Sequence, residues 1–180
     1  GTAWAGESTK NAEGTRRDEI RMSDRQVLGI STLGTLVDHP RIAAFRDFLS
    51  GWYLSYFVPQ LARKQPLTGA DPHLDRTGEN LARYVQFVER ENPDGFRQML
   101  KRIAPKIPGI LNIKPVPAPD KRLLLSFQAS GFDEAFFQQD MSDGTLKMLA
   151  YLLLMEDPNP PPLIGIEEPE NGLHHQLLAS

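Results

Sequence analysis

Apolar residues recur at helical spacing along four stretches of the chain. Residues 81–88 and 96–103 are amphipathic, and between them stands an Asn-Pro pair, a cap residue followed by proline at the first helical position. Together these two stretches predict a helical hairpin. A more continuously apolar helix is predicted over residues 142–156. Another, with a broad apolar stripe, is expected over residues 40–58.

Two short apolar runs bounded by proline and glycine predict strands. Residues 123–127 begin with three consecutive leucines, which suggests that both faces of this strand are covered. Residues 163–166 fit a buried strand that ends in a run of acids. Three alternating prolines over residues 115–119 indicate an extended crossover, and the polar residues 1–26 are expected to form a loop or a mobile insertion.

Composition narrows the function classes. With 180 residues, of which 40% are hydrophobic and 24% charged, the chain suits one globular domain or a piece of a larger one. The absence of cysteine excludes disulfides, thiolate metal sites and a cysteine nucleophile, and it fits the cytoplasm. No apolar run approaches the length of a membrane-spanning helix and no signal-peptide pattern is visible, so no membrane partner is expected.

Charge is nearly balanced along the chain. Twenty basic and 23 acidic residues leave a net charge of −3, which provides no global positive field for nucleic acid. The second hairpin helix nevertheless has a basic side, formed by Arg97, Lys101, Arg102 and, just beyond it, Lys106. This side is either a solvated face or a contact for nucleic acid or a partner protein.

The first motif with chemical potential is Met141-Ser142-Asp143-Gly144-Thr145-Leu146-Lys147, at the start of the apolar helix. Ser142 is suited to cap this helix, and Gly144 lets a ligand approach the backbone closely. Free amides and the positive dipole end make a helix start a natural phosphate site. The alternative is a capped helix that binds no ligand.

The second motif is the acidic pair Glu167-Glu168, directly after the predicted strand 163–166. Because side chains alternate along a strand, the two carboxylates should point in different directions, so one can hold a metal while the other addresses a water. Adjacent acids at the end of a core strand need a nearby cation, and Mg²⁺ suits them. The alternative is an acidic surface turn.

Together, about 20 residues apart and in this order, the two motifs resemble the signature and Walker B motifs of ATP-binding-cassette ATPases. More narrowly, the chain is similar to the predicted AAA-type ATPases of the SMC/RecF-like group, which pair an "LSDGT" helix with "EEPENGLHP". The resemblance covers roughly residues 39–180. It implies an α/β fold, part of a P-loop NTPase sheet core, with a helical lobe at 39–119 and a core segment at 120–180. Residues 1–38 lie outside it and are expected to be a polar loop or a partly ordered segment.

The resemblance also implies roles for individual residues. ATP and Mg²⁺ are the expected cofactors, and ATP is expected to lie at the interface of a homodimer. The residues that would contact the nucleotide bound by the opposite protomer are Ser142, Asp143, Gly144, Thr145 and His174. Glu167 stands at the position of the acid that helps to hold Mg²⁺, and Glu168 at that of the general base.

The sequence departs from the family pattern at four points. One is a further histidine, the switch residue that senses the γ-phosphate in the family, which is expected beyond a following strand and after Ser180. Glu167 stands where most cassette ATPases have aspartate, and His175 replaces the proline expected after His174. The chain also lacks the Gly-x-x-x-x-Gly-Lys-Ser/Thr loop that cradles ATP phosphates. The chain is therefore expected to be a central to C-terminal piece of an ATPase, inactive alone. The full protein would act in DNA maintenance or defence, with DNA or an effector protein as a partner. The alternative is a non-catalytic dimerisation or regulatory module that retains the signature helix.

Overall fold

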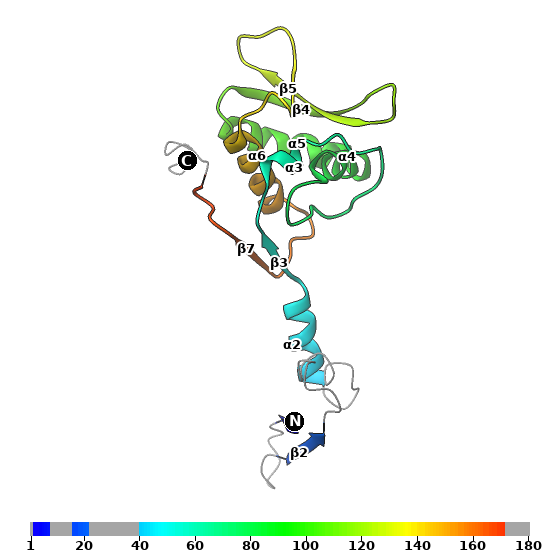
Figure 1. The fold of residues 1–180 in the computed structure, drawn as a ribbon, viewed down its shortest axis with the longest axis vertical. Coiled ribbons are helices and arrows are strands. Elements are labelled where there is room, and N and C mark those ends of the chain that lie inside the picture. The colour runs from blue at the N-terminus through cyan, green and yellow to red at the C-terminus, as the bar shows by residue number, and fades with distance from the viewer. Residues whose placement is uncertain (1, 8–15, 22–39, 172–180) are drawn as a thin grey trace. The chain divides into compact units, whose positions relative to one another are not determined.

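A computed structural model describes residues 2–7, 16–21 and 40–171 (Figure 1). The chain divides into two compact units, residues 1–52 and 53–180, which are described separately below. Among the described residues, no helix has both the length and the apolar character needed to cross a bilayer.

The first unit contains a hairpin and a helix. Strands β1 (Thr2–Glu7) and β2 (Arg16–Arg21) pair antiparallel, with Thr2 opposite Arg21 and Glu7 opposite Arg16. The prediction of a loop over residues 1–26 was therefore wrong for these two segments. Backbone N–H and carbonyl groups form the hydrogen-bond ladder between the strands. A polar segment can therefore pair even though its sequence has no apolar alternation that would predict a strand.

Helix α2 (Pro40–Ser50) is shorter than the sequence suggested. It ends before Gly51, whose N–H donates to the Asp47 carbonyl at 3.0 Å, and the chain continues as strand β3 (Trp52–Ser55) and helix α3 (Pro59–Ala62). The prediction of one helix over residues 40–58 was wrong. Glycine disfavours helix and aromatic residues favour strands, and the partner of β3 is strand β7 (Leu163–Ile166), which local periodicity cannot reveal.

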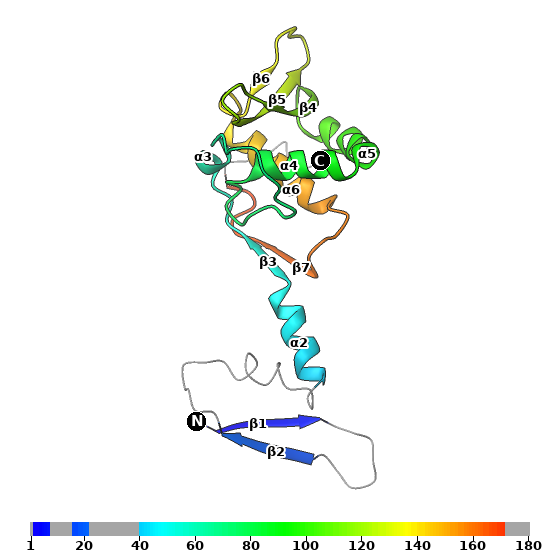
Figure 2. The ribbon, with the colours of Figure 1, turned by 90° about the vertical axis from the view of Figure 1, so that its right-hand side faces the viewer.

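The second unit is built on the helical hairpin of α4 (Leu81–Glu91) and α5 (Pro93–Ile103), as predicted. Asn92 begins α5 by accepting a hydrogen bond from the Gly95 N–H at 2.8 Å. A short 3₁₀ turn, η1 (Ala104–Lys106), follows α5. Helix α6 (Asp143–Met155) packs beside the hairpin (Figure 2) and is largely buried, as its apolar sequence predicted.

A three-stranded antiparallel sheet covers these helices, in the order β4 (Ile110–Pro117), β5 (Leu123–Ala129) and β6 (Phe136–Phe137). The extended crossover expected over residues 115–119 is thus mostly the end of strand β4. Pro115 lies opposite Leu125 on β5. The Leu125 N–H and carbonyl both bond to Gln138 and not to β4, so the sheet loses no hydrogen bond where proline lacks an N–H.

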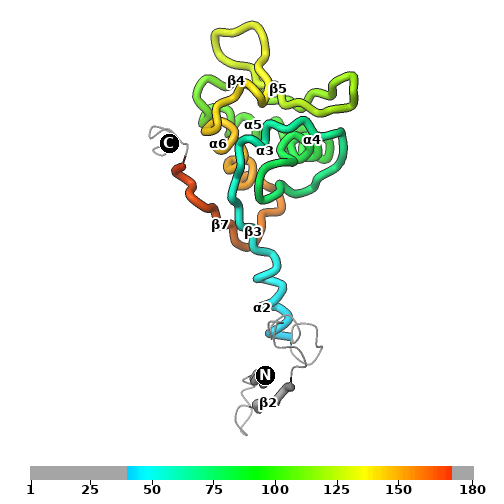
Figure 3. Tube along the Cα trace, viewed as in Figure 1, coloured from blue at the N-terminus to red at the C-terminus, as the bar shows by residue number. Residues whose placement is uncertain are grey.

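The two predicted strands are confirmed, but their burial differs from the expectation. Along β5 buried and half-buried residues alternate, so only one face lies in the core and the inference of two covered faces was wrong. Strand β7 is half-buried at all four positions. Figure 3 shows how the chain returns after α6 to place β7 alongside β3.

Candidate functional site

Ser142 caps helix α6, as the sequence predicted. Its Oγ accepts a hydrogen bond from the Thr145 N–H at 3.1 Å and lies 2.8 Å from the Thr145 hydroxyl. The remaining N–H groups of the first helical turn have no partner within the helix. An exposed serine and a positive dipole end therefore meet at this helix start.

Asp143, also in the first turn of α6, is paired with a cation that the sequence did not point to. The Arg63 guanidinium, at the end of α3, lies 2.5 Å from Asp143 Oδ1 and also donates to the Met141 carbonyl at 2.7 Å. The guanidinium offsets the negative charge of Asp143 and attaches α3 to the start of α6. No local signal identifies Arg63, because 80 positions separate the two partners.

Gly144 and Thr145 complete the helix start but are less accessible. Gly144 is buried and Thr145 half-buried, whereas Ser142 and Asp143 are exposed. Within the part of the chain that is described, a ligand at this helix start would therefore meet Ser142 and Asp143 first.

The acidic turn, residues 167–171, follows β7 and is held at both ends by hydrogen bonds. The Glu167 N–H donates to the Ser55 carbonyl at 2.9 Å, which extends the contact between β7 and β3. Glu168 has a φ of 44°, a conformation that only a well-supported turn maintains in a residue other than glycine. The Asn171 backbone N–H donates to the Glu168 carbonyl at 3.0 Å, and its side-chain amide donates to Glu168 Oε2 at 2.9 Å. Asn171 thus orients the Glu168 side chain.

The carboxylates suit a magnesium ion that is shared with phosphate. Glu167 and Glu168 are exposed, and no group of three or more His, Cys, Asp or Glu residues forms a metal cage among the described residues. Mg²⁺ commonly binds one or two carboxylates and completes its shell with water and substrate phosphates. The turn therefore fits a phosphate-assisted Mg²⁺ site and does not fit a metal held by protein ligands alone.

Lys147 joins the helix to the acidic turn. Its Nζ donates to the Glu168 carbonyl and to the Asn171 carbonyl, each at 2.7 Å, and its side chain is only 7% exposed. The Nζ also lies 5.8 Å from the centre of the Tyr151 ring. Burial lowers the pKa of Lys147, while the charges of Glu170 and Glu168 act in the opposite direction.

Sequence reasoning gave Lys147 no role, although a lysine in the most apolar helix of the chain was a visible signal. The structure connects the two predicted motifs through this residue. Ser142 to Thr145 start the helix that carries Lys147, and Glu168 accepts one of its hydrogen bonds. His174, the remaining predicted site residue, lies outside the described residues.

Comparisons with known proteins agree with the resemblance drawn from the motifs. Residues 10–180 match the family model described as "AAA domain, putative AbiEii toxin, Type IV TA system". No curated protein and no solved structure matches the chain. This family has a P-loop NTPase-like α/β fold and suggests an ATPase-like, nucleotide-binding function, and the mixed helices and strands described above are consistent with it. Because the match spans nearly the whole chain, the protein belongs to this family of AAA ATPase domains.

Proposed function

We propose that the chain supplies the signature helix and the acidic turn of an ATPase that hydrolyses Mg-ATP at a homodimer interface. The observation that carries the proposal is the pair of 2.7 Å hydrogen bonds from Lys147 to the carbonyls of Glu168 and Asn171. They join the two motifs in one unit, so a change at the helix start can reach the acidic turn. In this assignment β7 belongs to the ATPase sheet core, residues 39–119 form the inserted lobe, and residues 120–180 carry the site.

The start of α6 would receive the γ-phosphate of the ATP bound to the opposite protomer. Ser142 offers a hydroxyl and the first helical turn offers free amides, which is the arrangement that binds phosphate at helix starts. The carboxylate of Asp143 would repel phosphate if it stood alone. Its contact with Arg63 at 2.5 Å offsets that charge. Gly144, Thr145 and His174 are assigned to the same nucleotide contact from the resemblance.

Glu167 and Glu168 would divide the chemistry of hydrolysis. Glu167 would help to hold the hydrated Mg²⁺, an ion that when bound neutralises charge on the phosphates. Glu168 would accept a proton from the water that attacks the γ-phosphorus, while the bond to the ADP oxygen breaks and phosphate leaves. Asn171 would position Glu168 through its 2.9 Å hydrogen bond.

The phosphate-binding loop must come from sequence other than these 180 residues, because none of the glycines opens a Gly-x-x-x-x-Gly-Lys-Ser/Thr pattern. We therefore expect residues 1–180 alone to bind Mg-ATP weakly, and the full-length protein to be the active species. ATP hydrolysis would drive a conformational cycle of the dimer that acts on DNA or on an effector protein. The second candidate is a non-catalytic dimerisation or regulatory module, which the exposed, capped start of α6 would serve equally well.

The test is ATP turnover as a function of Mg²⁺ concentration in the full-length protein. Glu168→Gln should retain Mg-ATP binding but lose turnover by about 10²–10⁴-fold, since the amide still accepts from Asn171 but cannot take the proton. Glu167→Gln should weaken the metal site, and excess Mg²⁺ should partly restore its turnover. Glu170→Gln is the matched control, an exposed acid of the same turn with no assigned role, and should be unaffected.

Two results would contradict this assignment of roles. One is near-wild-type turnover of Glu168→Gln, and the other is equal rescue of both variants by Mg²⁺. A wild-type protein that dimerises with ATP yet never hydrolyses it would instead establish the regulatory module.

A further inference from the structure

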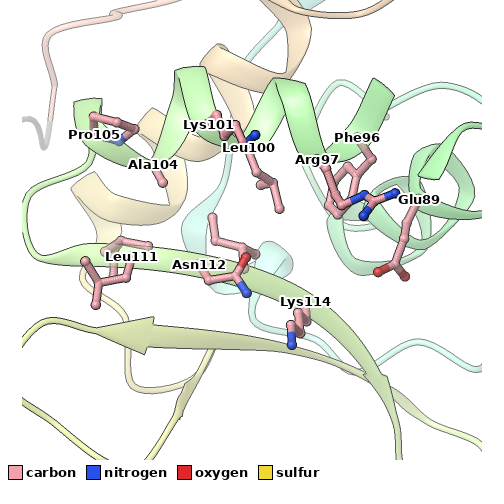
Figure 4. Close-up of a pocket in the computed structure, with 12 residues that line it drawn as sticks. Glu89, Phe96, Arg97, Leu100, Lys101, Ala104, Pro105, Leu111, Asn112 and Lys114 are labelled. Carbon is pink, nitrogen blue, oxygen red and sulfur yellow. The ribbon is translucent and has the colours of Figure 1, made fainter. Parts of the chain in front are cut away.

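A groove separates helix α5 from strand β4 in the second unit (Figure 4). Its volume is about 720 Å³, within the range of sites that take a drug-sized ligand or an anchoring side chain. The floor is apolar, with Phe96 and Leu100 from the helix and Ile113 from the strand. Leu111 stands at one end of the groove and is 62% exposed, so an accessible apolar side chain lies beside the buried floor.

The groove lies along the edge of β4 that faces away from β5. Both Figure 2 and Figure 4 show β4 as the strand of its sheet nearest to α5. This edge does not offer a ladder of backbone hydrogen bonds. Pro115 and Pro117 lack an N–H, and Ile113 is only 1% exposed. An added strand is therefore excluded as the occupant, and recognition has to come from side chains that enter the groove.

The rim of the groove is positively charged. Arg97, Lys101 and Lys114 line it, against the single acid Glu89. Arg97 is paired with Asp94. Within the described part of the chain, neither Lys101 nor Lys114 has an acid within ion-pairing distance, although acids exceed bases in the whole sequence. Two unpaired lysines beside an apolar floor complement a ligand that is apolar on one side and acidic on the other.

We propose that this groove, named here the α5–β4 groove, docks an acidic amphipathic helix of a partner protein. An amphipathic helix places apolar side chains in such a groove and keeps its charged residues at the rim. Nucleic acid fits less well, because Phe96 is 3% exposed and offers no free ring for stacking. A second copy of the chain also fits less well. Among the described helices, α2 exposes two large apolar side chains, Phe45 and Phe48, and α6 exposes only its last residue, Met155. The charge of α2 does not complement the rim, because Arg41 and Arg46 outnumber its single acid, Asp47.

The probes are three fluorescent peptides of about 16 residues, a length at which isolated helices begin to form. The first carries leucines at helical spacing with glutamates elsewhere, the second has lysine in place of each glutamate, and the third is a scrambled acidic sequence. Binding to the protein is measured by anisotropy at low and high salt. We expect the first peptide to bind most tightly and to weaken as salt rises.

Matched variants distinguish the groove from other surfaces. The double change Lys101→Glu with Lys114→Glu should weaken binding of the acidic peptide by about tenfold and strengthen binding of the basic peptide. Each ion pair between a rim lysine and a peptide glutamate contributes up to about 1 kcal/mol. Leu111→Ser should weaken both amphipathic peptides without unfolding the protein, because Leu111 is exposed. Arg76→Glu, an exposed charge reversal away from the groove, should change nothing.

The proposal is overturned if the wild-type protein does not bind the acidic peptide, if it binds acidic and basic peptides equally, or if the double reversal leaves the preference unchanged. It is also overturned if sedimentation shows a dimer that the double reversal dissociates, which would make a second copy the occupant. None of these measurements involves ATP, so they are independent of the proposed hydrolysis.

Discussion

Lys147 and Glu168, 21 positions apart, are joined by a 2.7 Å hydrogen bond from the lysine Nζ to the glutamate carbonyl. The acceptor is a backbone group of a residue with a φ of 44°, and the same ammonium also bonds to the Asn171 carbonyl. A buried cation that satisfies two carbonyls of one turn fixes the backbone of that turn. The orientation of the Glu168 carboxylate therefore depends on a residue of helix α6.

Replacing Lys147 with methionine should loosen the acidic turn. Methionine fills similar volume in the apolar helix but donates no hydrogen bond, so the two carbonyls lose their partner. We expect the free energy of unfolding to fall by about 1–3 kcal/mol and amide exchange at Asn171 to accelerate. Hydrogen exchange by mass spectrometry measures the second effect directly.

Lys114→Met is the control for Lys147→Met, because Lys114 is exposed and has no ion-pair partner among the described residues. It should leave both the stability and the exchange of the turn unchanged. Unaltered exchange at Asn171 in Lys147→Met would show that Lys147 does not hold the turn.

Ser142 allows the capping of α6 to be separated from a role at the dimer interface. Ser142→Ala removes the acceptor of the 3.1 Å bond from the Thr145 N–H and should cost about 1 kcal/mol of stability. Ser142→Asp keeps an excellent cap and should preserve stability, but it places a negative charge where the phosphate is proposed to bind. Thermal melts should therefore show a lower melting temperature for Ser142→Ala than for Ser142→Asp. Sedimentation should show the reverse order for ATP-driven dimerisation, which the aspartate should impair more than the alanine. A normal dimer fraction in Ser142→Asp would refute the phosphate contact.

Two buried tyrosines should respond in opposite ways to removal of their hydroxyl groups. Tyr84 donates to Asp157 Oδ2 at 2.7 Å, so Tyr84→Phe leaves a carboxylate without its partner and should cost about 1.5–3 kcal/mol. The Tyr151 hydroxyl is buried and has no partner among the described residues. Tyr151→Phe should therefore leave stability unchanged or raise it by up to about 1 kcal/mol. Urea unfolding of both variants tests the contrast, which equal losses would contradict.

Tyr151 should also make stability fall in alkaline solution. Burial raises the pKa of Tyr151 to about 12, with Tyr53 and Glu170 adding to the effect, whereas an unfolded tyrosine has a pKa of about 10. The fold favours the neutral form of Tyr151. Its contribution to the free energy of unfolding is therefore complete below pH 10 and is lost as the pH rises to about 12. At pH 11 the loss is about 1.4 kcal/mol. Tyr151→Phe should lack it, which a comparison of urea unfolding at pH 8 and pH 11 would show. Parallel pH profiles for the two proteins would argue against the shift.

Local chemistry was enough to predict several elements of this fold. The hairpin of α4 and α5, the Ser142 cap and strand β7 each follow from residues within one turn or one run of the chain. Helix periodicity, proline placement and capping act over three or four residues, so they can be read directly in the sequence. The two motifs that led to the ATPase family are local in the same sense.

Other features depended on contacts between distant segments. Residues 52–55 follow the apolar periodicity of a helix but form β3, because β7, more than 100 positions later, supplies a strand partner. Arg63 reaches Asp143 across 80 positions, and Lys147 bonds to the Glu168 and Asn171 carbonyls across 21 and 24 positions. The sequence alone determined which residues could carry the chemistry. Only the tertiary structure decided which of them meet, since pairing between distant segments depends on packing that no local pattern encodes.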